Sequence, residues 1–197
     1  MKHGLDINNC PLYPLLLCSG SRLCCHTGGD FGWEYTAGTI TRRELFNKTY
    51  DLNVSGAVIV SETFMPLLLE SADVFLTCGQ SSLHNFSTEG MPLPPPPAPG
   101  LPKTNELDGT AYRASKAALN FIMLNFTHRL TNDKVKIWAV SPAMLVTGLG
   151  NLGKGFMDKM EGKHPSIGGQ FVKDVLEGAK DAELGQVVHS NGTIQPW

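Results

Sequence analysis

The sequence lacks the features that would place it in a membrane or on a nucleic acid. It contains no run of about 20 apolar residues, the length that spans a bilayer. Its 18 Asp and Glu outnumber its 16 Lys and Arg, so no basic patch for nucleic acid or anionic lipid is expected. With 42% hydrophobic and 17% charged residues over 197 positions, it has the composition of a soluble globular protein of about one domain.

Signals for zinc binding and for secretion are also missing. No Cys-x-x-Cys pair or Cys/His spacing typical of a zinc site occurs. The short apolar run 12–18 contains Pro14 and follows Asp6 and two asparagines, which argues against a signal peptide. We therefore expect a cytoplasmic protein with reduced thiols. The cysteines, an odd number, are Cys10, Cys18, Cys24, Cys25 and Cys78.

Three stretches carry helix signals. Thr41, followed three residues later by Glu44, has the spacing of a capping box, and apolar residues continue from there to a helix end near 66–70. The Ala-rich stretch 111–130 has an apolar stripe at helical spacing, and 171–180 predicts a third helix. The stripe consists of Leu119, Ile122, Met123, Phe126 and Leu130.

Short apolar runs between these helices predict strands. The runs 74–77 and 135–140 have the length and composition of buried parallel strands, and 186–189 predicts a last short strand. Residues 1–30 show no clean periodicity. Strands that alternate with helices predict an α/β domain with a parallel sheet.

A proline-rich segment interrupts this alternation. Seven of the 13 prolines lie between Pro92 and Pro102. This composition predicts an extended polyproline-type surface loop over 91–102. We expect it to be an excursion beside an active site; the alternative is a ligand for an SH3-like partner.

Tyr112 and Lys116 form the pattern that carries chemistry. At a separation of four residues on a helix, the two side chains share a face. A free tyrosine titrates near pH 10, and a nearby ammonium favours the phenolate. Such a tyrosine can give a proton to a carbonyl oxygen or take one from an alcohol. The alternative interpretation is an exposed lysine one turn away from a packed tyrosine.

Four segments, in this order, resemble motifs of the short-chain dehydrogenase/reductase family. The most specific is YRASKAALN over 112–120, which resembles the family's active-site helix. The resemblance covers about residues 28–197, and its proline-rich insertion and C-terminal tail look most like a fungal subgroup. The other three are DLNVSG (51–56), similar to the motif whose Asn orders a water; VFLTC (74–78), similar to the strand before the catalytic serine; and SPAMLVT (141–147), similar to the nicotinamide-binding segment.

The resemblance implies a partial Rossmann-type, doubly wound parallel sheet that lacks its first βαβαβ portion. The family's T-G-x-x-x-G-I-G phosphate loop does not occur in the sequence. We expect 28–197 to be the C-terminal catalytic part of the domain. We expect 1–27 to be an irregular leader that arises from a retained intron or a mispredicted gene start; the alternative is a new structure. Gly28 then matches the glycine of the family's N-N-A-G loop, although residues 5–10 also have the right types in the right order for part of it.

The resemblance also assigns roles to single residues. It implies Tyr112 as the acid/base, Lys116 as the residue that lowers the tyrosine's pKa, Asn53 for the water relay and Cys78 in the position of the catalytic serine, with Ser81 or Ser82 as substitutes. A thiol is a weaker hydrogen-bond donor than a hydroxyl. The cofactor-binding residues implied are Tyr112, Lys116, Leu145, Thr147 and Gly28.

The expected function is an NADP-dependent oxidoreductase, with NAD as the alternative cofactor, that interconverts a ketone and an alcohol in fungal secondary metabolism. The expected partner is a small carbonyl or alcohol substrate, with no nucleic acid or membrane. We expect a homo-oligomer in which helices near 44–70 and 112–130 pair. Ala143 stands where the family has glycine, which adds a β-carbon beside the cofactor. The alternative function is a non-catalytic remnant, and a proline-rich interaction module is a third.

Overall fold

A computed structural model describes residues 23–26, 29–71, 74–77, 99–100, 109–147, 155 and 162–195. Their strands form one sheet in the order β1-β2-β3-β4-β5. Neighbours among β1 to β4 run parallel, and β5 runs antiparallel to β4. The strands are β1 (Leu23–His26), β2 (Val74–Thr77), β3 (Lys136–Ser141), β4 (Val187–His189) and β5 (Ile194–Gln195).

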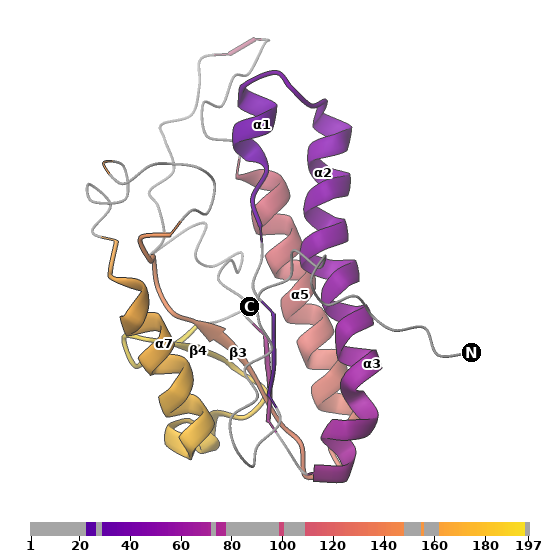
Figure 1. The fold of residues 1–197 in the computed structure, drawn as a ribbon, viewed down its shortest axis with the longest axis vertical. Coiled ribbons are helices and arrows are strands. Elements are labelled where there is room, and N and C mark those ends of the chain that lie inside the picture. The colour runs from indigo at the N-terminus through magenta and orange to yellow at the C-terminus, as the bar shows by residue number, and fades with distance from the viewer. Residues whose placement is uncertain are drawn as a thin grey trace.

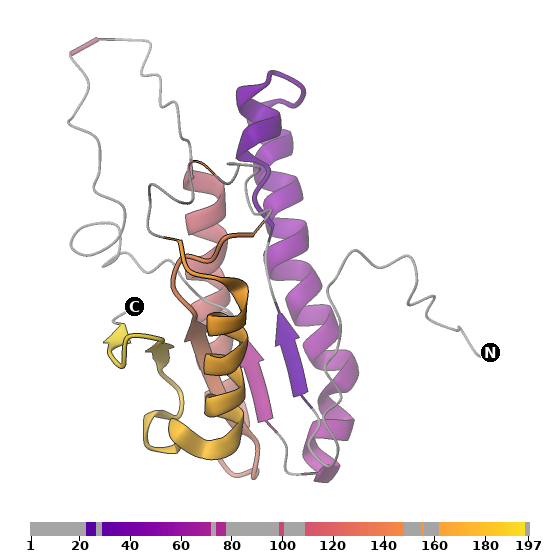
Figure 2. The ribbon, with the colours of Figure 1, turned by 60° about the vertical axis from the view of Figure 1, so that its left-hand side comes forward.

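Helices cover both faces of this sheet. A long rod made of α2, η1 and α3 packs with α5 on one face, whereas α7 lies on the other (Figures 1 and 2). This arrangement confirms the predicted α/β fold with a doubly wound parallel sheet. The helices are α1 (Gly32–Thr36), α2 (Arg42–Tyr50), the π-helical turn η1 (Asp51–Ser55), α3 (Gly56–Ser71), α5 (Thr110–Arg129), α7 (Pro165–Asp174), η3 (Val175–Ala179) and η4 (Asp181–Glu183).

The start of α2 confirms the capping box. The Thr41 hydroxyl accepts a hydrogen bond from the Glu44 backbone N–H at 3.3 Å, and the Thr41 N–H donates to Glu44 Oε2 at 2.7 Å. These reciprocal bonds satisfy N–H groups that a helix N-terminus otherwise leaves unpaired. Two hydrogen bonds that Thr41 donates to the Glu44 carboxylate lower the pKa of this carboxyl. The larger effect comes from the Thr41 backbone N–H and the smaller one from the Thr41 hydroxyl.

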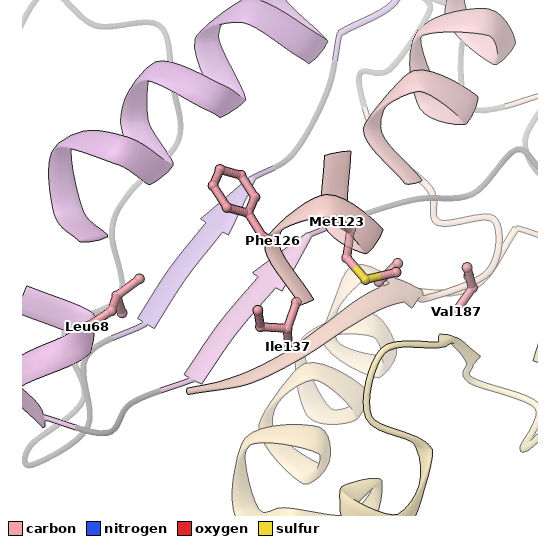
Figure 3. Close-up of a cluster of buried hydrophobic side chains, with 6 residues drawn as sticks. Leu68, Met123, Phe126, Ile137 and Val187 are labelled. Carbon is pink, nitrogen blue, oxygen red and sulfur yellow. The ribbon is translucent and has the colours of Figure 1, made fainter. Parts of the chain in front are cut away.

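The core has two parts because β3 is buried on both faces. Ile137 and Ala139 pack with Met123 and Phe126 of α5 and with Leu68 of α3 (Figure 3). The alternate residues of β3 pack on the α7 side, where the buried cluster consists of Trp138, Val140, Val175 and Val188. A strand buried on both faces reads as a continuous apolar run, which is how the sequence presents it. The apolar stripe predicted on the second helix is confirmed in α5.

The structure differs from the elements expected from the sequence at three places. Strand β1 occupies 23–26, where no periodicity predicted it, because its four residues pair with β2; that 1–27 is a leader stays a prediction. Helix α7 begins at Pro165 rather than at 171 because His164 caps it and Pro165 occupies its first turn. The predicted last strand is followed by β5, which only a hairpin with β4 reveals.

Part of the prediction lies outside the described residues. Apart from Pro99 and Gly100, this holds for the proline-rich segment 91–102, whose predicted conformation stays a prediction. Within the described part of the chain, none of the helices combines the length and apolar character that crossing a membrane requires.

Candidate active site

The site lies at the edge of the sheet where the parallel strands end. In Figure 2 the arrowheads of β1 and β2 point towards the end of the molecule at which α5 begins. Ligands of open α/β sheets bind at this carboxyl edge. Tyr112 is the third residue of α5, so its position in the chain brings it to that edge.

Asn53 connects three segments at this edge. Its Oδ1 accepts a hydrogen bond from the Gly29 N–H at 2.8 Å, and its Nδ2 donates to the Gly29 carbonyl at 3.0 Å. The same Nδ2 donates to Ser115 Oγ at 2.9 Å. Both amide hydrogens of this buried side chain are therefore used within the protein, and only acceptor capacity remains for a water.

A wide π-helical turn keeps Asn53 on the buried stripe of the rod. The buried residues Leu45, Thr49, Asn53, Ala57 and Ser61 recur every four positions. In a regular α-helix a four-residue step drifts by about 40° around the axis. The π-helical turn Asp51–Ser55 needs more residues per turn and so offsets part of this drift.

Lys116 is buried beside Tyr112. The Lys116 side chain is 2% exposed, and its Nζ lies 5.5 Å from the centre of the Tyr112 ring. The interpretation of Lys116 as an exposed surface lysine is therefore wrong. A buried ammonium is costly unless other groups compensate it, and the face of an aromatic ring is one such partner.

The segment after β3 is held in a fixed path. Ala143 has φ +69°, in the left-handed region that favours glycine. The Val146 N–H donates to the Lys163 carbonyl, and the Lys163 N–H donates to the Met144 carbonyl, both at 2.9 Å. A Cβ at Gly168 would lie 2.5 Å from Leu145 Cδ1 and 3.2 Å from Pro142 Cβ, so the glycine lets α7 lie close to this segment without displacing either side chain.

These contacts bring two predicted cofactor-binding residues to the same edge. Leu145 is half-buried in the bridged segment, and Thr147 is exposed two residues further on. Ser141 stands two positions after Ala139, so its side chain lies on the α5 face of β3. Its hydroxyl is buried and has no hydrogen-bond partner among the described residues. A buried hydroxyl without a partner and a buried ammonium, both on the α5 side, are groups that fit a polar ligand such as a nicotinamide ribose.

Two predicted site residues are not part of this geometry. Gly28 and Cys78 lie outside the described residues, as do the substitutes Ser81 and Ser82. Their roles stay predictions. Strand β2 ends at Thr77 on the carboxyl edge, the residue before Cys78.

Ser115 is a site residue that sequence reasoning missed. Its hydroxyl accepts from Asn53 Nδ2 and donates to the Tyr112 carbonyl at 2.7 Å. The one available signal was local: a serine three residues after Tyr112 on a helix can reach that carbonyl. Its contact with Asn53 joins positions 62 residues apart and has no sequence signature.

Two fungal proteins are similar to this chain in sequence. The short-chain dehydrogenase/reductase tropE of Talaromyces stipitatus is 42% identical over 173 residues, which cover 84% of this chain and 64% of the relative. The short-chain dehydrogenase/reductase eupG of Phoma sp. is 35% identical over 184 residues, which cover 87% of this chain and 65% of the relative. The chain thus spans slightly less than two thirds of these relatives. No family model matches it.

Solved structures show the same fold at low sequence identity. The carbonyl reductase Sniffer of D. melanogaster has a TM-score of 0.63 at 16% identity, covering 90% of this chain and 67% of that one. The NADPH-bound carbonyl reductase from chicken fatty liver has a TM-score of 0.60 at 16% identity, covering 81% of this chain and 60% of that one.

Proposed function

Because the chain belongs to the short-chain dehydrogenase/reductase family, we propose that it interconverts a ketone and an alcohol with NADP(H), or with NAD(H), as cofactor. The observation that carries this proposal is the buried ammonium of Lys116 beside the Tyr112 ring at the carboxyl edge of the sheet. The fungal origin of both sequence relatives supports a place in fungal secondary metabolism. The cytoplasm is the proposed location.

Tyr112 is the proposed acid/base. In reduction its phenol gives a proton to the carbonyl oxygen of the substrate, and in oxidation its phenolate takes the proton of the alcohol. Lys116 favours the phenolate because its ammonium lies close to the ring. A nicotinamide, when bound, supplies or accepts the hydride that completes the reaction.

Asn53 is the proposed link to a water relay. Asn53 donates both hydrogens of its amide, one to the Gly29 carbonyl and one to Ser115 Oγ, so the side chain holds these two segments together. Its remaining acceptor positions are the second lone pair of Oδ1 and the backbone carbonyl in the π-helical turn. A water held there can carry protons from solvent towards the buried ammonium.

The remaining assignments concern binding. The residues proposed to hold the nicotinamide end are Tyr112, Lys116, Leu145 and Thr147, and Gly28 is proposed as a further cofactor-binding residue. Cys78 is proposed to donate a hydrogen bond to the substrate carbonyl, more weakly than a serine would. The substrate is a small carbonyl compound or alcohol.

We also propose that two copies pair through α3 and α5. Phe121 of α5 is 70% exposed and Ile59 of α3 is 64% exposed. Arg129 and Glu62 join these two helices at 3.7 Å. Exposed apolar residues on adjacent helices are typical of an association surface. Sedimentation equilibrium of the purified chain tests this: a monomer at all concentrations contradicts the pairing.

Replacement of Tyr112 by Phe tests the function. Phe retains the ring and removes the hydroxyl that transfers the proton, so Tyr112→Phe should abolish NADPH-dependent reduction of a panel of aliphatic and aromatic ketones, followed at 340 nm. The matched control is Tyr35→Phe, because the Tyr35 ring lies against Arg42 and has no role in the proposed mechanism. Turnover retained by Tyr112→Phe at more than a few per cent contradicts the assigned role. Absence of turnover in the unmodified chain favours the non-catalytic alternative.

A further inference from the structure

The first turn of α5, which carries Tyr112, has no side-chain cap. Its N-cap residue is Gly109, which makes no side-chain hydrogen bond to the helix. The first N–H groups of a helix lack intrahelical partners, and an uncapped first turn is more easily disordered. Another contact must hold the backbone of this turn in place if Tyr112 is to meet a substrate in one geometry.

The Ser115 hydroxyl provides such a contact from one turn further along. Ser115 is fully buried, and its hydroxyl donates to the Tyr112 carbonyl at 2.7 Å. Because its one hydrogen is used there, the hydroxyl can only accept the hydrogen bond from Asn53 Nδ2. The directions of both bonds are therefore determined.

The orientation of the Asn53 amide agrees with this assignment. The Gly29 N–H lies 2.8 Å from Oδ1, so that atom must be the acceptor and Nδ2 the donor. The resulting series of bonds runs from the backbone after β1, through the π-helical turn, to the first turn of α5. It connects the turn that carries Tyr112 to the segment after β1 and to the rod made of α2, η1 and α3.

We propose that Ser115 is a positioning residue, which sets the first turn of α5 against Asn53 and thereby holds the Tyr112 phenol near the Lys116 ammonium. This inference rests on the proposed function for its catalytic meaning. Ser115 itself touches neither substrate nor cofactor in this role. Loss of the Ser115 hydroxyl leaves an Asn53 N–H without its buried acceptor and removes the side-chain hydrogen bond to the Tyr112 carbonyl.

The first experiment needs no substrate or cofactor. Phenolate absorbance near 295 nm is titrated with pH in the full chain and in Tyr112→Phe, and the difference isolates Tyr112 from the other three tyrosines. We expect Ser115→Ala to raise the midpoint of this component by roughly half a pH unit or more, because the phenol is no longer held near the ammonium. An unchanged midpoint overturns the proposal.

Ser61→Ala is the matched control. Ser61 is also a buried helical serine, and its hydroxyl donates to the Ala57 carbonyl at 2.6 Å on the neighbouring helix α3. It should lose stability much as Ser115→Ala does and leave the Tyr112 midpoint unchanged. If both variants shift the midpoint equally, Ser115 has only a packing role and the proposal is wrong.

Kinetics provide the second readout. With any ketone that the unmodified chain reduces, Ser115→Ala should lower kcat by roughly ten- to a hundredfold and leave the KM for NADPH nearly unchanged, since misplacement of the acid/base affects the chemical step. Ser115→Cys retains the side-chain volume with a poorer hydrogen-bonding group and should be intermediate in both readouts. It also replaces Ser115→Ala if that variant does not fold.

The two proposals fail in different ways. A shifted Tyr112 midpoint in Ser115→Ala, with no turnover of any carbonyl by the unmodified chain, supports the positioning role and overturns the oxidoreductase proposal. Turnover that depends on Tyr112, with kcat and the Tyr112 midpoint unaffected in Ser115→Ala and Ser115→Cys, supports the oxidoreductase proposal and overturns the positioning role.

Discussion

The two faces of the sheet differ in the polarity of the side chains buried against them. The buried cluster on the α7 face consists of Trp138, Val140, Val175 and Val188, all apolar apart from the indole N–H, which donates to the Lys180 carbonyl at 2.7 Å. On the other face, among the described residues, lie the buried polar side chains: Thr49, Asn53, Ser61, Ser115, Lys116, Asn120 and Ser141.

This difference separates support from chemistry. Burial of a polar group is unfavourable unless it finds a hydrogen-bond partner, so a layer with a purely structural role has no need of an ammonium and an amide. The face with α5 retains both at the carboxyl edge, where the strands end. We therefore call the α7 face the supporting face, because its side chains serve stability, and the α5 face the working side, because it carries the groups for chemistry. Four substitutions test this division.

The largest loss of stability should follow truncation on the supporting face. Trp138 is fully buried, and Trp138→Ala should lower the free energy of unfolding by about 3–5 kcal/mol, measured by urea denaturation, because it leaves a large cavity. Trp138→Phe, the milder variant, should still fold and leave the Tyr112 titration unchanged. A shifted Tyr112 midpoint in Trp138→Phe would show that the two faces are not separable.

The opposite pattern is expected at Lys116. Met has a similar length and no charge, so Lys116→Met should lower kcat by about a hundredfold, which corresponds to about 2.7 kcal/mol, and leave stability nearly unchanged. The control is Lys173→Met on the α7 side, where the exposed ammonium pairs with Glu177 at 2.6 Å. That variant should have unchanged kcat. A large loss of stability with normal kcat in Lys116→Met would assign Lys116 to the support.

A smaller effect, a gain in the free energy of unfolding, is expected at Ala143 in the segment after β3. Ala143→Gly removes a β-carbon from a left-handed residue and should raise the free energy of unfolding by about 0.5–1 kcal/mol, after the entropy that glycine adds to the unfolded chain. Ala139→Gly, within regular β3, should lower it instead. Equal losses in both variants would mean that φ at Ala143 is not a source of strain.

The smallest effect should come from an exposed charge on the working side. The pKa of Glu44 is lowered, chiefly by the Thr41 backbone N–H, so its ionised form contributes stability above its ordinary pKa of 4.5. This contribution is lost as the pH falls through the lowered value. Glu44→Gln should therefore be less stable than the unmodified chain at pH 7, with a difference that disappears in acid. A difference that is constant with pH contradicts this.

The local signals of the sequence were sufficient for much of the scaffold. The start of α2 was predictable from Thr41 and Glu44, and α5 was predictable from an apolar stripe at helical spacing. The shared face of Tyr112 and Lys116 follows from their separation of four residues. Each of these features depends on neighbours within one or two turns of chain, which is why the order of residues alone determines them.

The rest depended on how distant segments meet. The burial of Lys116 follows from what covers the shared face, and spacing carries no information on that. Strand β1 exists because β2 pairs with it, and Asn53 reaches Gly29 and Ser115 across 24 and 62 residues. The left-handed Ala143 breaks a local preference because the Lys163 bridge holds its segment in that path. Helix capping and periodicity were thus determined by the sequence itself, whereas the geometry of the site was decided by the tertiary structure, because its hydrogen bonds form only after folding brings remote backbone and side chains together.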